Sequence, residues 1–433
     1  MATWPKVKLA AFVNLLAGFP FKSQRFTDKP DDVPLVKGEN VSQGCILWDI
    51  SKRWPASDWN KMEKFHLLPG DVVIAMDRPW IPAGLKWSFI RAGDPKSLLV
   101  QRCARLRSNN ARLDQNFLRF VIGGPGFEGY VKPITTGVNV PHISGQQILD
   151  FEFTLPPLPV QRRIAGILSA YDELMENSQR RIRLLEAMAR ALYREWFVHF
   201  RFPGHEKRSS PFGRGGGEGR AKLVSSPLGD IPQGWEVVSI DDVCARVTDG
   251  SHHSPKSVNE GLPMASSKDM HDWGLNLDTA RLISPEDFAD LVRNDCKPKR
   301  NDVLITKDGA NYLKYVFVTR AEQEVVLLSS VAMLRPNARI NPHLLAAILK
   351  EPENKGRLKN YVTGAAIPRV ILKDFKRFEL LLPGKEVQAA WAKIAEPMTE
   401  QIWRLIDKIH NLHRTRDLLL PRLLSGQVKF ELS

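Results

Sequence analysis

The sequence predicts an α/β (mixed α+β) fold in which two tandem-repeated globular domains are separated by two long antiparallel coiled-coil helices, with pseudo-two-fold symmetry. Two observations lead to this prediction. Several phrases recur in the same order in the two halves of the chain, which indicates duplication of a whole domain. Each copy is followed by a long run in which apolar residues step alternately by four and three, the pattern of a coiled-coil helix.

The repeated phrases lie at a nearly constant offset. TGVNVPHI at 136–143 matches TGAAIPRV at 363–370, and GDVVIAMD at 70–77 matches NDVLITKD at 301–308. The further matches are PLVKGEN (34–40) with PMASSKD (263–269), and Trp4, Leu9 and Gly18 with Trp235, Ile240 and Gly250. The period is far longer than that of a solenoid, so we interpret the pattern as a tandem duplication.

Each repeat mixes β-branched strand candidates with short helical patterns broken by Gly and Pro, as in a compact α/β or α+β domain. The stretch that follows Pro203 is rich in Gly, Ser and charged residues, which is typical of a flexible linker. The predicted divisions are a first domain at 1–158, a first helical region at 159–202, a flexible linker at 203–232, a second domain at 233–385 and a second helical region at 386–433.

The stretch LAAFVNLLAGF at 9–19 follows two lysines and faintly resembles a signal peptide. Asn14 interrupts its apolar run, however, and no small-x-small cleavage site follows. Its counterpart after Trp235 lies in mid-chain, where no signal could act. We therefore expect a short amphipathic helix at both places.

The two apolar seams predict long helices that pair with each other. The first seam consists of Ile164, Leu168, Tyr171, Met175, Ser178, Ile182, Leu185, Ala189, Leu192 and Trp196. The second consists of Trp391, Ile394, Met398, Ile402, Leu405, Ile409, Leu412, Leu419 and Leu423. Pro397 is expected to kink the second helix or delay its start, and Pro421 to bend its end. The alternative, two ordinary core helices, does not require seams of this length and regularity.

The chain has a net charge of +14 and a pI near 9.6, which favours a polyanionic partner, either nucleic acid or an anionic membrane. A basic protein without such a partner is the alternative. The four cysteines are isolated from one another, so a zinc cluster is not expected, and they indicate the reduced thiols of a cytoplasmic protein. No apolar run reaches transmembrane length, and we expect no membrane partner.

The sequence contains no convincing catalytic motif. The G-x-G-x-x-G match at Gly124, Gly126 and Gly129 is followed by a proline and a turn, so we expect a loop there rather than a dinucleotide site. Nuclease-like triplets (94–96 and 353–355) have no upstream acidic partner, and the His252–His253 and His410/His413 pairs lack a completing ligand. We therefore predict no catalytic residue, no metal and no cofactor bound by this chain.

Two helical signatures carry a family resemblance. LPPLPVQRRIAGILSAYDELMENSQRRIRLLEAMARALYREWFVHF (155–200) resembles the first conserved region of the specificity subunits of Type I restriction-modification enzymes, and RDLLLPRLLSGQV (416–428) resembles the second. The two repeat openings resemble the starts of two subtypes of target recognition domain. The chain departs from the family pattern at Gly384, Lys385 and Glu386, where a Pro-rich phrase is usual, and at Pro397.

The resemblance implies a DNA-binding subunit without enzymatic activity. Each target recognition domain would read one half of a split, asymmetric target in double-stranded DNA, and the helices would act as a ruler between them. Two methylation subunits would clasp the helices and bring S-adenosylmethionine, and restriction subunits, where present, would bring ATP and Mg²⁺. The TG…P phrase would mark the transition in the chain from each recognition domain to the long helix that follows it.

Candidate DNA contacts combine basic residues with amides and aromatic rings, which suit phosphate anchoring and base-edge contact. They lie on loops after matching strands and at the repeat starts. In the first repeat they are Lys22, Gln24, Arg25, Arg78, Trp80 and Lys86, and in the second His252, His253, Lys256, Lys307, Asn311, Tyr312 and Lys314. The alternative is that these loops only pack on their own domains.

Two other functions stay open on the sequence alone. A coiled-coil scaffold or adaptor would join partners without reading DNA, and would show little affinity for random duplex to be lost as salt rises. A single-chain nuclease would cleave DNA with Mg²⁺ when pure.

Overall fold

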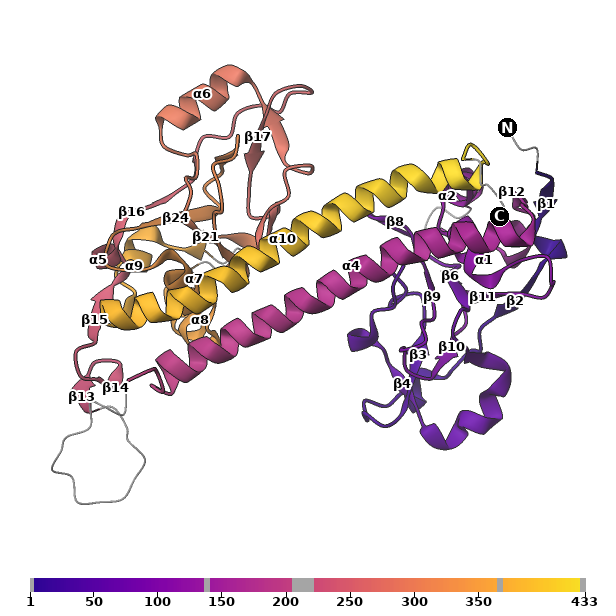
Figure 1. The fold of residues 1–433 in the computed structure, drawn as a ribbon, viewed down its shortest axis with the longest axis horizontal. Helices are drawn as coiled ribbons and strands as arrows, with labels where there is room; N and C mark the ends of the chain where they lie inside the picture. The colour runs from indigo at the N-terminus through magenta and orange to yellow at the C-terminus, as the bar shows by residue number, and fades with distance from the viewer. Residues whose placement is uncertain (1–3, 136–140, 205–221, 364–368, 429–433) are drawn as a thin grey trace. The chain divides into compact units, whose positions relative to one another are not determined.

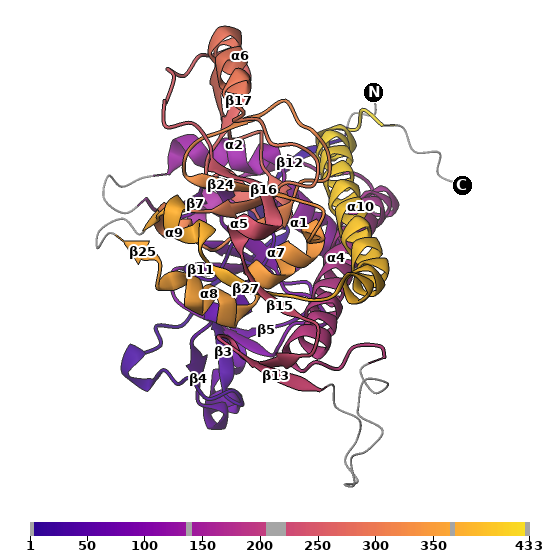
Figure 2. The same cartoon turned by 90° about the vertical axis from the view of Figure 1, so that its left-hand side faces the viewer.

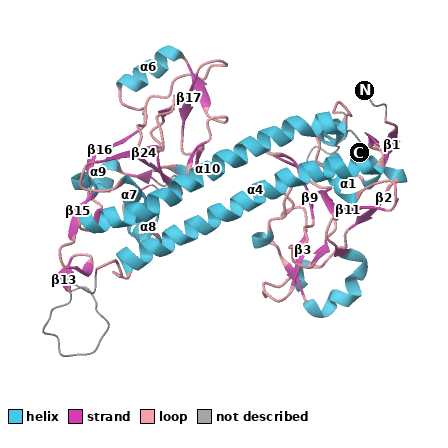
Figure 3. Cartoon of the chain, in the orientation of Figure 1, coloured by secondary structure: helices cyan, strands magenta, loops and turns pink. Residues whose placement is uncertain are grey.

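The computed structural model describes residues 4–135, 141–204, 222–363 and 369–428. The chain forms two compact units, one of residues 1–178 with 407–433 and the other of residues 179–406. Both units mix helices and strands (Figure 3). The long helices α4 (Leu158–Tyr193) and α10 (Lys385–Leu424) each contribute a segment to both units. Most of the linker predicted at 203–232 lies outside the described residues.

The first unit is built around two four-stranded sheets (Figure 1). One is antiparallel, in the order β2 (Val13–Ala17), β11 (Cys103–Ser108), β6 (Val72–Ala75), β9 (Trp87–Phe89). The other has the order β4 (Arg53–Trp54), β3 (Val33–Val36), β10 (Ser97–Leu99), β5 (His66–Leu67), with β3 and β10 parallel. The remaining elements are β1 (Lys6–Lys8) paired with β12 (Glu152–Thr154), β7 (Trp80–Ile81) paired with β8 (Gly84–Leu85), and the helices α1 (Gln115–Ile122), α2 (Pro125–Ile134) and α3 (Gly145–Leu149).

The second unit repeats this plan. Its antiparallel sheet has the order β16 (Cys244–Asp249), β24 (Val331–Pro336), β21 (Val303–Thr306), β22 (Val316–Val318). Its second sheet has the order β20 (Arg281–Ile283), β17 (Leu262–Ala265), β23 (Val326–Leu327), with β17 and β23 parallel. The other strand pairs are β15 (Glu236–Ser239) with β27 (Glu379–Leu382), β13 (Leu223–Ser226) with β14 (Gly229–Pro232), β18 (Met270–His271) with β19 (Gly274–Leu275), and β25 (Val362–Thr363) with β26 (Arg369–Val370).

The second unit contains the helices α5 (Ile240–Val243), α6 (Pro285–Arg293), α7 (Pro342–Lys350), α8 (Pro352–Lys359) and α9 (Leu372–Lys376). The last three follow strand β24 as α1, α2 and α3 follow strand β11 in the first unit. Figure 2 shows α7 and α8, which pack on each other just as α1 packs on α2 in the first unit. Together with the sheet orders, this confirms the predicted mixed α/β fold with two tandem domains and long helices.

A glycine is required at the same place in both units. A Cβ on Gly18 would lie 2.2 Å from the carbonyl oxygen of Val100, and one on Gly250 would lie 2.2 Å from that of Leu327. In each case the chain passes against the backbone of the strand that pairs in parallel, as the bridges Phe19–Val100 and Ser251–Leu328 show. The Gly18–Gly250 echo in the sequence therefore reflects a close backbone approach that admits no side chain.

A buried ion pair is also duplicated. The Arg107 guanidinium meets both carboxylate oxygens of Asp71 at 2.7 Å, and Arg335 meets those of Asp302 at 2.8 and 2.9 Å. Each carboxylate also accepts from the backbone nitrogen three residues before it, at Leu68 or Lys299. Asp302 is fully buried, so its charge is stable in the core only because these donors surround it.

Replacing Asp302 with alanine is expected to destabilise the second unit by about 3–5 kcal/mol, because Arg335 would lose the carboxylate that compensates its partly buried charge. Urea denaturation measures this change. The double variant Asp302→Ala/Arg335→Met should be more stable than Asp302→Ala alone. Arg201→Ala, which opens the exposed Arg201–Glu195 pair, serves as control and should change the midpoint little. Equal midpoints for Asp302→Ala and Arg201→Ala would contradict the assigned role of the buried pair.

Each long helix docks on its own domain through one glutamine. Gln161 of α4 accepts from the Asp114 nitrogen at 2.9 Å and donates to the carbonyls of Arg112 and Pro156. Gln388 of α10 does the same, accepting from the Asn341 nitrogen at 3.1 Å and donating to the carbonyls of Arg339 and Pro383. All of these partners are backbone atoms, so these six hydrogen bonds do not depend on which side chains the domain carries.

The seam residues are placed in the packed faces of the helices. Tyr171, Ile182, Leu185, Leu192, Ile409, Leu412 and Leu419 are half-buried, and Ile164, Leu168, Met175, Trp196, Ile402, Leu405 and Leu423 are buried. Within the first unit Arg416 of α10 binds Asp172 of α4 at 2.9 Å. Within the second, Phe197, just after α4, packs against Trp391 near the start of α10 at 5.8 Å. The start of α10 thus meets the end of α4, and the end of α10 meets the first half of α4, as antiparallel pairing requires.

Two predictions about the second helix are wrong. Ile394, assigned to the seam, is 40% exposed, and Ala395 is buried instead. The start of α10 packs on its own domain through Val387, Trp391 and Ala395. These residues are four apart, so the buried stripe follows the helix rather than a coiled-coil seam. Of the two effects expected of Pro397, a kink or a delayed start, the delay is wrong, because the helix begins at Lys385 and continues past the proline.

Two local predictions in the first domain are also wrong. Residues 9–19 form a single 3₁₀ turn (Leu9–Ala11) and then strand β2, because β2 pairs with β11 over five residues. At the corresponding place in the second domain a helix of four residues, α5, lies between β15 and β16. The glycine-rich match forms helix α2, with Gly124 as its N-cap and Pro125 in its first turn. Phe127 and Val131, four residues apart and fully buried, supply the packing that holds this helix.

Candidate nucleic-acid interface

Both domains carry a carboxylate where the third strand of the antiparallel sheet ends. Asp77 follows β6 and Asp308 follows β21. Each forms a backbone bridge with the residue that comes directly after the repeated TG…P phrase, Asp77 with His142 and Asp308 with Arg369. Their side chains meet as well, His142 Nδ1 at 2.5 Å from Asp77 and Arg369 Nε at 3.4 Å from Asp308. We name these two pairs the carboxylate latches.

The phrase itself lies largely outside the described residues, since 136–140 and 364–368 are not described. The latches show what both copies share at its end: a basic residue held by the carboxylate that closes the other repeated phrase. The recurrence of both phrases is therefore explained by a contact between them, Asp77 with His142 in the first domain and Asp308 with Arg369 in the second.

The first latch is surrounded by further positive charge. Arg102 places Nε 3.1 Å from Asp77, and its side chain is still 68% exposed. Arg78, next to Asp77, is exposed, and its backbone nitrogen donates to the carbonyl of Pro141 at 2.7 Å. Both arginines have positive φ, 46° at Arg78 and 67° at Arg102, a conformation that non-glycine residues seldom adopt. Such strained positions cluster at sites that bind ligands.

The second latch joins a buried network of charges. Lys307 Nζ lies 2.6 Å from Asp249 at the end of β16 and 3.9 Å from Asp308. His252 Nε2 also approaches Asp249, at 3.2 Å, with its ring mostly exposed. Burial raises the pKa of Asp308, and Lys307 and Arg369 counter part of this rise. The predicted candidates His252 and Lys307 are thus brought together through one carboxylate.

Lys86 and Lys307 are not surface anchors, contrary to the sequence prediction. Both side chains are buried, 9% and 6% exposed. Lys307 is held by Asp249, and the positions that correspond to this pair in the first domain are Met76 and Ala17. A charged pair in one domain therefore replaces an apolar pair in the other. Burial lowers the pKa of Lys86.

The candidates at the start of the first repeat lie on the surface. Lys22 and Gln24 are exposed. Arg25 stacks over the Trp54 ring at 4.5 Å and binds Asp58 at 2.6 Å, while about half of its side chain stays exposed. Arg25 is thereby held in one orientation at the surface.

The remaining candidates differ in how freely they face solvent. His253, Lys256 and Lys314 are exposed, whereas Trp80, Asn311 and Tyr312 are half-buried. Trp80 donates to Thr135 Oγ1 at 3.3 Å, and Asn311 to the carbonyl of Ser267 at 3.4 Å. Tyr312 packs on the core of the second domain. These three side chains are thus held against their own domains.

Sequence reasoning missed the latch residues Asp77, His142, Asp308 and Arg369, and it missed Arg102. A signal for the latches was present, because both copies of one phrase end in Asp and both copies of the other are followed by a basic residue. Arg102 had no such signal, since its position depends on the turn between β10 and β11.

The latches and their neighbours suit contact with a polyanion. Exposed guanidinium groups at a strand end can bind phosphate oxygens through paired hydrogen bonds. Within the described residues, no group of three or more His, Cys, Asp or Glu side chains is arranged to hold a metal ion. None of the described helices is both long enough and apolar enough to cross a membrane.

A family model described as "Type I restriction modification DNA specificity domain" matches residues 1–187 and 232–412, one segment for each repeat. The Type I restriction enzyme MjaIX specificity subunit of Methanocaldococcus jannaschii is 25% identical over 315 residues, which cover 70% of this chain and 66% of that protein. The Type I restriction enzyme EcoBI specificity subunit of Escherichia coli is 22% identical over 442 residues, which cover 98% of this chain and 86% of that protein.

The fold is similar to that of a solved structure. The crystal structure of a Type-I restriction-modification system S subunit from M. genitalium has a TM-score of 0.58 and 14% identity, with 99% of this chain and 97% of that chain covered. At this identity the likeness concerns the fold alone. It agrees with the tandem mixed α/β fold and the long helices described above.

Proposed function

The chain belongs to the Type I restriction modification DNA specificity family, and from this premise we propose that it is the subunit that recognises the DNA target in a Type I restriction-modification system. Each of its two recognition domains reads one half of a bipartite target. The observation that carries this proposal is that the two domains share a backbone framework but differ in the basic residue of the latch. The first latch holds His142 and the second holds Arg369. A shared scaffold with changed polar residues suits two domains that read different bases.

The proposed partners are double-stranded DNA, two methylation subunits and, where the system has them, restriction subunits. The exposed side of α4 in the second unit supports this. Leu184 and Met188, one helical turn apart, are 57% and 54% exposed, an apolar surface suited to a protein partner. We assign no enzymatic activity and no cofactor to this chain: S-adenosylmethionine belongs to the methylation subunits, and ATP with Mg²⁺ to the restriction subunits. The four free cysteines fit a reducing, cytoplasmic setting.

Methylation profiling of DNA from cells that carry this chain with its methylation subunit tests the proposal. One bipartite motif, absent without the chain, is expected. The scaffold alternative predicts no motif and little affinity for duplex DNA at any salt concentration. Methyl transfer or Mg²⁺-dependent cleavage by the pure chain would contradict its assignment as a non-catalytic subunit.

A further inference from the structure

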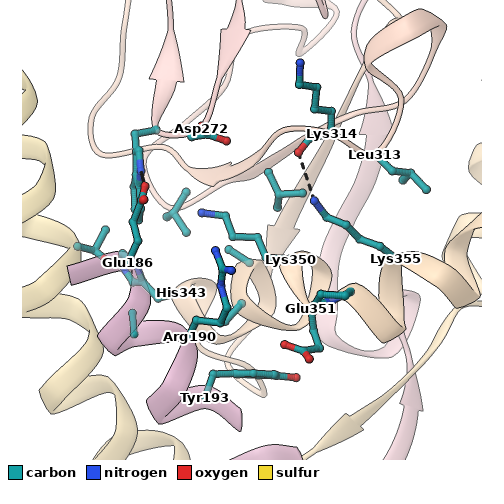
Figure 4. A pocket seen from close by; sticks show the side chains of 18 of the residues that line it. Glu186, Arg190, Tyr193, Asp272, Leu313, Lys314, His343, Lys350, Glu351 and Lys355 are labelled. Carbon is teal, nitrogen blue, oxygen red and sulfur yellow. Dashed lines mark hydrogen bonds between the residues drawn. The ribbon is translucent and has the colours of Figure 1, made fainter. Parts of the chain in front are cut away.

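The second unit contains a cavity of about 760 Å³ between α4, α7, α8 and the strand β22 (Figure 4). All of its lining residues belong to this one unit. Its walls combine small apolar side chains, such as Val316, Val318 and Ala346, with the rings of Tyr193 and Trp273. Its volume falls within the range of about 300–1,000 Å³ that is usual for small-molecule sites.

The duplication shows that the framework does not require this cavity. Val316 and Val318 pair with Ile305 and Val303, and the strand partners at the same register in the first domain are Trp87 and Phe89. The Trp87 ring packs so closely on α1 that a Cβ on Gly123 would lie 2.0 Å from it. The same framework is therefore filled by large rings in one domain and lined by valines in the other.

Helices α1 and α7 differ in the same way at one position, with a large side chain in the first domain where the second has a small one. Counting from the N-caps Asp114 and Asn341, Arg119 of α1 corresponds to Ala346 of α7. The Arg119 guanidinium lies 4.1 Å from the centre of the Phe89 ring and 3.1 Å from Asp172 of α4. Ala346 has no such side chain, and the cavity occupies this space. Lys350, which lines the cavity, stands where the first domain has Gly123.

Five Lys and Arg side chains line the cavity, and three of them, Arg190, Lys350 and Lys355, come from three different helices. Arg190 extends from α4, Lys350 from the end of α7 and Lys355 from α8 (Figure 4). Among the described residues, no carboxylate lies within ion-pair distance of Arg190 or Lys350. The Lys350 ammonium lies over the Trp273 ring at 4.2 Å, and Lys355 donates to the carbonyl of Lys314 at 3.2 Å.

Two of the three carboxylates in the lining are already engaged. Glu186 accepts from the Trp273 indole nitrogen at 2.5 Å, and Glu351 binds Arg194 at 2.5 Å. Asp272 is the third. Burial lowers the pKa of Lys350 to about 8; the charges of Asp272 and Glu186 oppose this fall, and Lys355 and Arg190 add to it. An anion among these side chains would stabilise their charged forms.

We propose that this cavity binds a small anionic molecule that carries an aromatic ring, the chemistry of a nucleoside monophosphate. The anionic group lies among Arg190, Lys350 and Lys355, and the ring packs against the valines and the aromatic wall. This site is separate from the latches, and its existence does not depend on DNA recognition.

Calorimetric titration of the full chain with AMP, GMP, CMP and TMP, without DNA, tests the proposal. We expect at least one monophosphate to bind with a Kd below about 1 mM. Adenosine lacks the anion and inorganic phosphate lacks the ring. Each should therefore bind with an affinity at least about tenfold lower than that of the monophosphate. S-adenosylmethionine, with adenosine but no phosphate, should behave like adenosine. If no monophosphate binds, or if phosphate alone binds as tightly, the proposal is wrong.

Two variants locate the site. Lys350→Met removes one cation and keeps the length of the side chain, so affinity should fall about ten- to a hundredfold. The melting temperature of the ligand-free protein should rise, because the variant removes a buried ammonium whose charged form burial disfavours. Lys373→Met, at an exposed position of α9, is the matched control and should change neither quantity.

The second variant, Val316→Trp/Lys350→Gly, installs the residues of the first domain. Since that domain accommodates Trp87 against Gly123, the variant is expected to fold and to lose binding. A circular dichroism melt establishes folding independently. A folded variant that binds the monophosphate as tightly as the wild type would overturn the proposed site.

Discussion

Replacing residues 1–158 with the recognition domain of another specificity subunit will change one half of the methylated motif completely and leave the other half unaltered. The physical reason is that each domain has its own core. The buried cluster around Phe117 and Leu118 belongs to the first unit and that around Leu344 and Leu345 to the second. The junction at Gln161 uses only backbone atoms of the domain, so a foreign domain can make the same three hydrogen bonds.

The exchange is read by methylation profiling of cells that carry the hybrid and its methylation subunit. The donor must also pack its own side chains on α4, because Phe117 and Leu118 share a buried cluster with residues of that helix. Arg119 must be matched or omitted, because it binds Asp172 of α4 from a buried position. A hybrid with Asp172→Ala is the control for donors that lack this arginine. A motif in which both halves change together would show that the domains do not read independently.

The duplication and the long helices could be predicted because they depend on patterns that span many residues. Gly18 with Gly250, Asp71 with Asp302 and Gln161 with Gln388 occupy matching positions and make matching contacts. Backbone approach, buried charge and backbone hydrogen bonding each tolerate few substitutions. Such positions therefore keep the same residue type in both copies.

The failures have one cause, namely that tertiary packing overrides local pattern. Residues 13–17 have an apolar content that suits a helix, yet β11 offers them a strand partner over their full length. The glycines of α2 oppose a helix, but burial of Phe127 and Val131 outweighs their cost. Lys307 looked like a surface base because its partner Asp249 lies 58 residues away in the chain. No local pattern reveals such a partner.

The candidate interface was predicted only in part for the same reason. Surface residues such as Lys256 and Lys314 follow from composition and loop position. The latches depend on which strand end meets which loop, and Arg102 depends on a turn with positive φ. The comparison of the two domains, rather than either alone, makes these residues visible.

The insertion of four residues after Ser178 is expected to move the two half-targets one or two base pairs further apart, with both half-sequences kept. Four helical residues add about 6 Å, and one base pair of B-DNA occupies about 3.4 Å. The insertion interrupts the alternate spacing of four and three residues between apolar positions of the seam. The coiled coil unwinds locally at this stutter, so the two domains separate by less than the full added length. This is why the expected change is one or two base pairs rather than a fixed two.

Ser178 is the suitable place because the first unit ends there and the second begins at Gln179, so the insertion enters neither domain core. Ser178 is buried, and its hydroxyl donates to the Leu174 carbonyl at 2.7 Å within the same helix, so no hydrogen-bond partner on another element is lost.

A matched insertion of four residues after Ile406 of α10, where the chain passes from the second unit back to the first, lengthens the second helix equally. The double insertion should give the full two base pairs, because neither helix then restrains the other. Methylation profiling reads the spacer directly. If both variants fold, assemble and methylate with the original spacer, α4 and α10 do not set the distance between the half-targets, and the domains must find them by another constraint.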